Sequence, residues 1–557
     1  MSFLKPASRF TKGYLPQWRT SATSRLPVVN SSHGRHAHPF PCTTPFTATP
    51  CFVPTAQYTT NRKENACYQH GTEQKFDSTD PKTPRRFPCV DHIEERSRQL
   101  ATHQDTPHRI RGPPGHQVFH YPHRFQCDYK GYLPEFTLAY ETWGQLNATR
   151  DNAILLHTGL SASSHAKSHP ANESPGWWEK FIGPGRAIDT NQFFVICTNV
   201  LGGCYGSTGP SSIDPRTDKP YATAFPMLSI HDMVRAQFYL LDHLNITKLH
   251  ASVGASMGGM QSLVAGAMYP QRVARLVSIS ACARSHPYSI AMRHVQRQVL
   301  MSDPHWRKGY YYDHIPPHAG MKLAREIATI SYRSGPEWER RFGRQRVKPE
   351  SAPEFCPDFL IETYLDRQGE RFCLEYDPNS LLYISKAMDL FDMSYTALEE
   401  LVAHRDIGME QKGHSHGAVE NSDEKSARGP HPPYPHVVRV NADRISQHSP
   451  RSTSTPFNPT ANPTTGAMVG LDTMESRRDL IKGLQAIQIP TLVLGVKSDI
   501  LFPVWQQQEI AQTLRRGGNQ RVTYYELDAL YGHDTFLIDA VNIGAAVKGH
   551  LENVVEL

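Results

Sequence analysis

The sequence predicts an α/β fold in which a parallel sheet with crossover helices is interrupted by a run of helices. Three observations carry this prediction. Strand-like runs alternate with helical spacing between residues 136 and 280, helical patterns then fill 284–400, and the alternation resumes at Thr491. Strands that alternate with helices are typical of parallel sheets, because each parallel connection needs a crossover. One core domain with a helical insertion accounts for all three.

Each predicted strand is a short run bounded by turn residues. Phe136–Thr142 alternates between apolar and polar residues, as a strand with one buried face does. The other predicted strands are Ala153–His157, Phe193–Cys197, His250–Val253, Arg275–Ser280, Thr491–Gly495 and Val522–Leu527.

The predicted helices follow the strands. In Ser229–Leu244 apolar residues recur every three or four positions, which favours a helix with one buried face. The other core helices are expected over Gly259–Met268, Val504–Leu514 and from Thr535 towards Val554, and the clearest helices of the insertion over His286–Met301, Met321–Ser334 and Pro378–Met393.

Composition divides the 557 residues into five segments. Residues 1–115 and 405–470 are rich in Pro, Ser, Thr and His and lack sustained periodicity, which is typical of disordered segments. Between them we expect the first part of the α/β core at 116–283 and a helical lid at 284–404. The second part of the core is expected at 471–557.

The N-terminal stretch has an unusual charge pattern. Its first acidic residue is Glu64, whereas eight Lys and Arg residues precede that position. A basic stretch rich in Ser and Thr without acidic residues indicates an organellar transit peptide. We therefore predict the mitochondrial matrix; the alternative is an ordinary disordered tail on a cytoplasmic protein.

Overall composition excludes several classes of protein. The net charge of +6 arises from 59 basic and 53 acidic residues, too mixed for a nucleic-acid-binding protein. No run of about 18 apolar residues occurs, so no membrane span is expected. None of the ten cysteines forms a Cys-x-x-Cys pair, which indicates reduced thiols and no zinc site.

The most specific signal is Gly254-Ala-Ser256-Met-Gly258, a Gly-x-Ser-x-Gly motif between a predicted strand and a predicted helix. This context is what a nucleophile elbow of an α/β-hydrolase fold requires, because the turn pushes the serine hydroxyl out above the sheet. The turn needs small residues two positions before and after the serine, and both are glycine. The motif predicts Ser256 as a nucleophile; the alternative is a glycine-rich turn with an idle serine.

A serine nucleophile needs a base and an acid that orients the base. In this fold the acid and then the histidine follow the serine along the chain, each after a later strand. Asp499 follows the predicted strand Thr491–Gly495, and His533 follows Val522–Leu527. We therefore expect Ser256 to attack an acyl carbonyl, His533 to relay its proton and Asp499 to hold the imidazole.

The oxyanion that forms in such an attack needs two backbone donors. One should be the N–H of Met257, directly after the nucleophile. The other should come from the loop after Ala153–His157, where Gly159 or Leu160 is expected to supply it.

Six further stretches are jointly distinctive. They are Gly254–Gln261, Asn199–Ser212, Trp177-Trp178 before Gly183–Gly185, Arg297 within Val295–Gln298, Ser380–Asp392 and Ser498–Pro503. Together they resemble the homoserine O-acetyltransferase family. The resemblance covers roughly residues 120–400 and 475–557 and leaves out the N-terminal stretch and residues 405–470.

This resemblance implies transfer of an acyl group from acyl-CoA to an amino-acid hydroxyl through an acyl-serine intermediate. Acyl-CoA would be a co-substrate, with no bound cofactor or metal. The lid would form a tunnel for the pantetheine arm and the contact of a homodimer. The matching positions are Ser256, Asp499 and His533 for the triad, Leu160 and Met257 for the oxyanion hole, and Arg297 and Asp534 for the carboxylate and amino ends of the amino acid.

The acceptor and the acyl group are not fixed by these motifs. The loop His157–His165 has one residue more than the usual homoserine enzymes, and Ala255 stands where they mostly have glycine. Together with the basic N-terminus, this looks more like the fungal mitochondrial branch that transfers an acetyl or succinyl group to serine for cysteine synthesis. The alternatives are a homoserine O-acetyltransferase of methionine synthesis and an esterase or thioesterase with the same triad.

Overall fold

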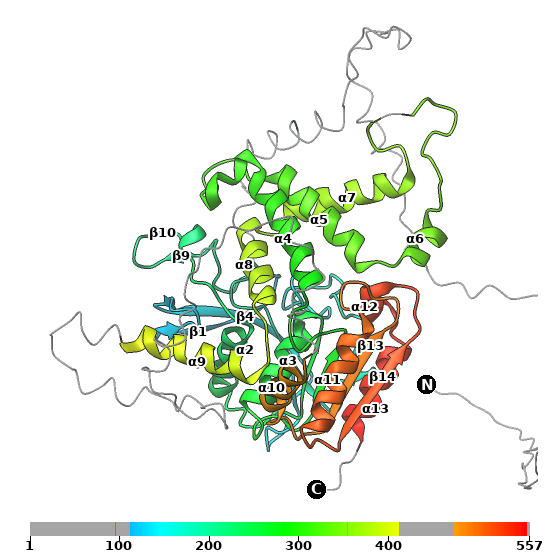
Figure 1. Ribbon diagram of the computed structural model, residues 1–557. Coiled ribbons are helices and arrows are strands. Elements are labelled where there is room, and N and C mark those ends of the chain that lie inside the picture. The colour runs from blue at the N-terminus through cyan, green and yellow to red at the C-terminus, as the bar shows by residue number, and fades with distance from the viewer. Residues whose placement is uncertain (1–94, 96–111, 354, 411–472, 554–557) are drawn as a thin grey trace, which may run out of the picture. The chain divides into compact units, whose positions relative to one another are not determined.

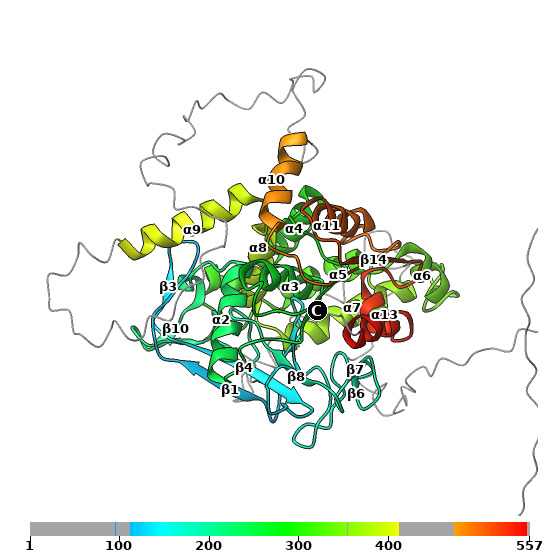
Figure 2. The same cartoon turned by 90° about the horizontal axis from the view of Figure 1, so that it is seen from below.

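The computed structural model describes Glu95 and residues 112–353, 355–410 and 473–553, all of which belong to one compact unit, Arg85–Leu557 (Figures 1 and 2). The predicted transit peptide and most of the predicted 405–470 insertion lie outside these residues. Among the described helices, none combines the length and the apolar content that a membrane span needs.

A mixed sheet of eight strands forms the centre of the unit. Its order is β1 (Gln117–Tyr121), β4 (Phe136–Trp143), β8 (Phe194–Thr198), β5 (Ala153–His157), β11 (Ala251–Ala255), β12 (Leu276–Ile279), β13 (Thr491–Val496) and β14 (Val522–Leu527). The strands from β8 to β14 are parallel, and β4 pairs antiparallel with β8 and β1. The predicted α/β-hydrolase fold is confirmed, and each predicted strand is present.

The edge strand β1 and three short two-stranded ladders were not expected. The ladders are β2–β3 (Phe125–Gln126, Tyr132–Leu133), β6–β7 (Ile182–Gly183, Ile188–Asp189) and β9–β10 (Ile213–Asp214, Lys219–Pro220). Strands of two residues have no periodicity that a sequence pattern can reveal, and β1 buries only Phe119. Tertiary pairing, and not local sequence, creates these elements.

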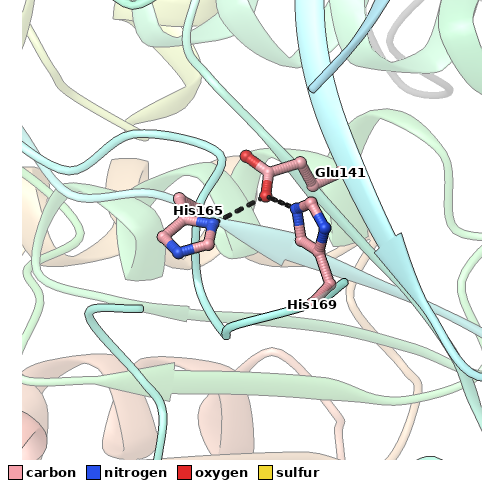
Figure 3. A group of neighbouring side chains, drawn as sticks. All are labelled: Glu141, His165 and His169. Atoms are coloured by element: carbon pink, nitrogen blue, oxygen red, sulfur yellow. Dashed lines mark hydrogen bonds and ion pairs between the residues drawn. The ribbon is translucent and has the colours of Figure 1, made fainter. Parts of the chain in front are cut away.

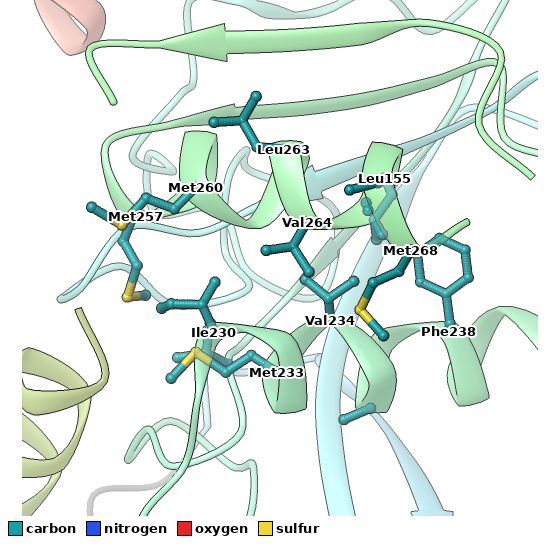
Figure 4. Packing of buried hydrophobic residues seen from close by; sticks show 14 of the residues in the cluster. Leu155, Ile230, Met233, Val234, Phe238, Met257, Met260, Leu263, Val264 and Met268 are labelled. Carbon is teal, nitrogen blue, oxygen red and sulfur yellow. The ribbon is translucent and has the colours of Figure 1, made fainter. Parts of the chain in front are cut away.

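Helices cover both faces of the sheet, and each face has its own apolar core. One core includes residues of α2 (Ile230–His243), α3 (Met257–Met268), α10 (Met474–Leu484) and α11 (Val504–Arg516). The other core includes Ile543, Val547 and Leu551 of α13 (Asn542–Glu552). Figure 4 shows Val234 and Phe238 of α2 facing Val264 and Met268 of α3 across the first core.

The C-terminal helix differs from its prediction. A single helix from Thr535 towards Val554 is wrong, because the chain forms α12 (Thr535–Ile538) and then α13 after a break. The carboxylate of Asp539 accepts a hydrogen bond from the backbone N–H of Asn542 at 2.9 Å, which starts a new helix in place of continuing the first.

Between β12 and α10 the chain forms the predicted helical insertion. It contains α4 (Pro287–Ser302), α5 (His318–Tyr332), α6 (Gly335–Arg341), α7 (Leu360–Glu375) and α8 (Pro378–Asp389). Helices α4, α5, α7 and α8 share an apolar cluster of their own around Leu300, Met321 and Phe372. Helix α9 (Tyr395–Glu410) crosses the boundary predicted between 404 and 405 and packs beside α10.

Candidate active site

Ser256 lies in a strained turn between β11 and α3. Its backbone has φ +57° and ψ −127°, a conformation that L-residues rarely adopt. A Cβ atom at Gly254 would lie 2.1 Å from the carbonyl oxygen of Gly258, and a Cβ at Gly258 would lie 2.4 Å from that of His157. The turn therefore closes only with glycine at both positions, as the motif predicts.

His533 and Asp499 form a buried pair at the neighbouring strand ends. Asp499 follows β13, and His533 lies in the short helix η6 (Gly532–Asp534) after β14. The Nδ1 of His533 lies 2.7 Å from one carboxylate oxygen of Asp499, whose other oxygen accepts from the N–H groups of Leu501 and Phe502 at 2.9 and 2.8 Å. With Nδ1–H donated to Asp499, the lone pair of a neutral imidazole lies on Nε2, the nitrogen that a general base uses.

The imidazole is also packed tightly. The ring of Phe502 stacks on that of His533 with centroids 5.2 Å apart, and the ring of Phe536 meets it edge-on at 5.3 Å. Ser256 and His533 line one cavity of about 330 Å³. The elbow and the base therefore face the same enclosed space, as expected from their places in the sequence.

The pKa of His533 reflects competing effects. Burial alone would lower it, because burial penalises the charged imidazolium. The charge of Asp499 and its hydrogen bond, together with the charge of Asp534, outweigh burial and raise the pKa above its ordinary value. Burial also raises the pKa of Asp534, and the charges of Arg333 and His533 oppose this.

The two positions predicted for the oxyanion donors lie on either side of the elbow. Met257 is the first residue of α3, and backbone N–H groups in a first helical turn have no partner within the helix. Gly159 and Leu160 line the cavity. The side chain of Gln261 in α3 donates to the carbonyl of Thr158 at 2.9 Å, which ties the loop to the elbow helix.

The charged lining of the cavity is mostly cationic. Its lining includes Arg293 of α4, Arg325 in the middle of α5 and Arg333 directly after α5, whereas Asp534 is its one carboxylate. Arg333 lies 3.1 Å from that carboxylate. The Nε of Arg293 lies 2.5 Å from Asp389, and its buried Nη1 has no hydrogen-bond partner among the residues that the structure describes.

Arg297 is not among the residues that line the cavity. Its guanidinium binds Asp389 and lies 3.2 Å from the hydroxyl of Ser385. Arg297 and Arg293 therefore hold opposite oxygens of the same carboxylate. Sequence reasoning missed Arg293, although its position one helical turn before Arg297, on the same face of α4, was a signal that could have found it.

Comparisons with known proteins agree with this geometry. A family model described as the alpha/beta hydrolase fold matches residues 152–415. A serine O-succinyltransferase of Emericella nidulans is 55% identical over 84% of this chain and 87% of its own length. A homoserine O-acetyltransferase of Moorella thermoacetica is 36% identical over 76% of this chain and 92% of its own length. The chain belongs to the family of serine O-succinyltransferases and homoserine O-acetyltransferases.

Members of this family are acyltransferases that act on small molecules, and this chain is one of them. A crystal structure of the homoserine O-acetyltransferase from Bacillus anthracis has a TM-score of 0.60 at 23% identity, covering 80% of this chain and 99% of that one. At this identity the likeness supports the fold alone.

A first prediction concerns the elbow glycines of this acyltransferase. Gly258→Ala would press a methyl group against the backbone of His157, which cannot swing away, so we expect a loss of about 1–3 kcal/mol in unfolding free energy. Gly549→Ala in α13 is the control, because its Cβ meets nothing within 4 Å and alanine favours a helix by about 1 kcal/mol. Urea denaturation measures both; equal effects would contradict the packing argument.

A second prediction concerns pH. With the acyl donor alone, the rate of release of its leaving group should increase with pH, with a midpoint above the ordinary histidine pKa of about 6.5, because the raised pKa keeps His533 protonated to higher pH. Asp534→Asn removes one negative charge that raises the pKa of His533, so the midpoint of the pH–rate curve should move to lower pH. Pre-steady-state rates from pH 5 to 9 measure the midpoint. A midpoint in Asp534→Asn that is unchanged or higher would contradict this electrostatic account.

Proposed function

We propose that the enzyme transfers a succinyl group from succinyl-CoA to the hydroxyl of L-serine through an acyl intermediate on Ser256. The observation that carries this proposal is the arginine-rich lining of the cavity, which contains Arg293, Arg325 and Arg333 and one carboxylate, Asp534. Both proposed substrates bring a carboxylate, one on the succinyl chain and one on the amino acid. The name of the Emericella nidulans relative, a serine O-succinyltransferase, agrees with this choice.

In the first half-reaction Ser256 attacks the thioester carbonyl while His533 accepts the hydroxyl proton. The C–O bond to the serine forms as the carbonyl becomes an oxyanion, which the N–H groups of Leu160 and Met257 stabilise. The intermediate then collapses, the C–S bond breaks, and His533 returns the proton to the leaving thiolate of CoA. Asp499 keeps the imidazole in the required tautomer throughout.

In the second half-reaction the amino acid replaces CoA. His533 takes the proton of its hydroxyl, the oxygen attacks the acyl group on Ser256, and the serine leaves with the proton from His533. Asp534 is positioned on the cavity wall to bind the ammonium group of the acceptor. Its pairing with Arg333 leaves room for this role, because a carboxylate has more acceptor sites than one guanidinium contact uses.

Arg293 is the residue that we propose for the carboxylate of the succinyl group. Arg293 lines the cavity, and its buried Nη1 has no acceptor among the described residues; a buried donor without an acceptor is costly. Arg297 then acts through Asp389, which it shares with Arg293, and not by direct contact with substrate.

Homoserine is the second candidate acceptor, favoured by the Moorella thermoacetica relative. The two acceptors differ by one methylene, which an enzyme pocket distinguishes by about 1–3 kcal/mol. The test is a matrix of serine and homoserine against succinyl-CoA and acetyl-CoA, with product mass as readout. O-succinylserine should be the main product; CoA release that is equally fast with and without an amino acid would instead indicate an esterase or thioesterase.

A third prediction concerns the two residues on which this function depends. Ser256→Ala should lower kcat by about 10³-fold or more, by analogy with other serine triads. Arg293→Leu should lower kcat/KM for succinyl-CoA about 10- to 100-fold, the worth of one hydrogen bond to a charged group, but that for acetyl-CoA less than threefold. Acetyl-CoA is the internal control. An equal loss of kcat/KM with succinyl-CoA and acetyl-CoA would show that Arg293 does not select between the two donors.

We also propose that the enzyme works in the mitochondrial matrix and as a homodimer. The location rests on the basic, acid-free stretch before Glu64. The dimer rests on exposed apolar side chains of the insertion, namely Tyr288, Val295, Leu323 and Ile330 on α4 and α5. The N-terminal residue of the protein isolated from mitochondria and its mass in solution test the two proposals.

A further inference from the structure

A carboxylate is buried in the apolar layer behind the active site. Glu141 lies on β4 opposite Cys197 of β8, and its side chain is 1% exposed. Two residues further on, and therefore on the same face of the sheet, Trp143 belongs to the second apolar core. A charge in such a place is costly unless it is paired and fully hydrogen-bonded.

All the side-chain donors to this carboxylate come from the loop that follows β5. The hydroxyl of Ser164 lies 2.8 Å from one oxygen. Nδ1 of His165 and Nε2 of His169 each lie 2.8 Å from the other oxygen, and Figure 3 shows these two contacts. The same loop begins with Gly159, Leu160, Ser161 and Ala162, which line the active-site cavity.

The contacts of the two imidazoles fix where the protons lie. The Nδ1 of His169 accepts a hydrogen bond from the N–H of Ala171 at 3.2 Å, so its proton is on Nε2, which faces Glu141. His165 is different, because its Nε2 lies 2.7 Å from the carbonyl oxygen of Ser174 and its Nδ1 faces the carboxylate. Each ring nitrogen of His165 therefore faces an oxygen atom, one of a carboxyl group and one of a backbone carbonyl.

Two histidines and a carboxylate whose ligand atoms lie within 4.8 Å of one another are also a possible metal site. A metal would require a lone pair on Nε2 of His169, but that nitrogen carries the proton because Nδ1 accepts from Ala171. The hydrogen bonds therefore favour a buried Glu–His hydrogen-bond cluster.

We propose that Glu141, His165 and His169 form an anchor that positions the oxyanion segment 159–162, with His165 bridging Glu141 and the carbonyl of Ser174. Short connections lead from the anchor to the active site. The N–H of His165 donates to the hydroxyl of Ser163 at 3.2 Å, and the indole of Trp177, which lines the cavity, donates to the carbonyl of Ser163 at 3.0 Å. Leu160 precedes Ser164 by four residues.

The anchor and the insertion hold the segment from two sides. The hydroxyl of Tyr376, the residue that ends α7, donates to the carbonyl of Leu160 at 2.7 Å. The anchor fixes the other end of the segment to β4. Because an oxyanion donor must lie within about 0.5 Å of its productive position, loss of one support should slow acylation more than it weakens substrate binding. This inference rests on the proposed function.

The experiment measures single-turnover acylation with succinyl-CoA and no acceptor, followed by CoA release and by the mass of the acyl-enzyme. Glu141→Gln and His165→Gln should slow acylation about tenfold or more, with a KM for succinyl-CoA within about threefold of the wild type. His169→Gln should change the rate less than about threefold, because an amide N–H can replace a neutral donor. If Glu141→Gln does not fold, the acylation rates of His165→Gln and His169→Gln test the proposal.

Asp214→Asn is the matched control. Asp214 is also a buried carboxylate, paired with Arg216, but it lies in the β9–β10 hairpin and does not line the cavity. The Asp214→Asn variant should have a lower melting temperature, while its acylation rate stays within about twofold of the wild type.

Wild-type acylation rates in folded Glu141→Gln or His165→Gln would overturn the proposal. So would equal losses in both histidine variants together with stoichiometric metal in the purified wild type, which would establish a metal site. A wild type that forms no acyl-enzyme would refute the proposed function instead.

Discussion

The strained backbone of Ser256 is the constraint on which the rest of the site depends. A left-handed conformation at a non-glycine residue costs about 1–3 kcal/mol and persists only where the surroundings leave no alternative. Here β11 is paired on both sides, and the N–H of Ser256 extends the ladder to the carbonyl of Ile279 at 2.9 Å. Every residue of α3 is buried. Neither flank can move to release the strain.

Parallel strands explain why distant parts of the chain meet at this turn. The ends of β5, β11, β13 and β14 lie at one edge of the sheet, and each is followed by one component of the site. The core therefore supplies Ser256, Asp499 and His533. The arginines of the cavity all come from the insertion, whereas Asp534, its carboxylate, comes from the core, so both parts of the chain line the space around Ser256.

Much of this arrangement was predictable from sequence because it depends on local patterns. The strands are short runs between turn residues, and the Gly-x-Ser-x-Gly spacing follows from the closeness of backbone atoms within the turn. Asp499 and His533 follow strands whose order is characteristic of the fold. The residues that sequence reasoning missed depend on side-chain partners. The helical spacing puts Arg293 and Arg297 on one face of α4, but only the fold shows that both bind Asp389 and that Arg293 is the one that lines the cavity.

The Glu141 anchor was hidden for the same reason. Its members come from a strand and a loop, and their histidines resemble the many others in the chain until the fold brings them to one carboxylate. Sequence showed the expected position of the oxyanion loop but not what holds it there. The hydrogen bonds to the buried carboxylate of Glu141 show what contacts this loop.

The insertion also contacts the turn that carries His533. Gly532, with φ +60°, lies against the end of α5, where an added Cβ would be 3.0 Å from the backbone of Arg333 and Ser334. Ser334 also donates a hydrogen bond to the carbonyl of Leu530, and Arg333 pairs with Asp534. The turn that carries His533 is thus held by the insertion as well as by the core. The position of α5 therefore affects both the placement of His533 and, through Arg333 and Asp534, its electrostatic environment.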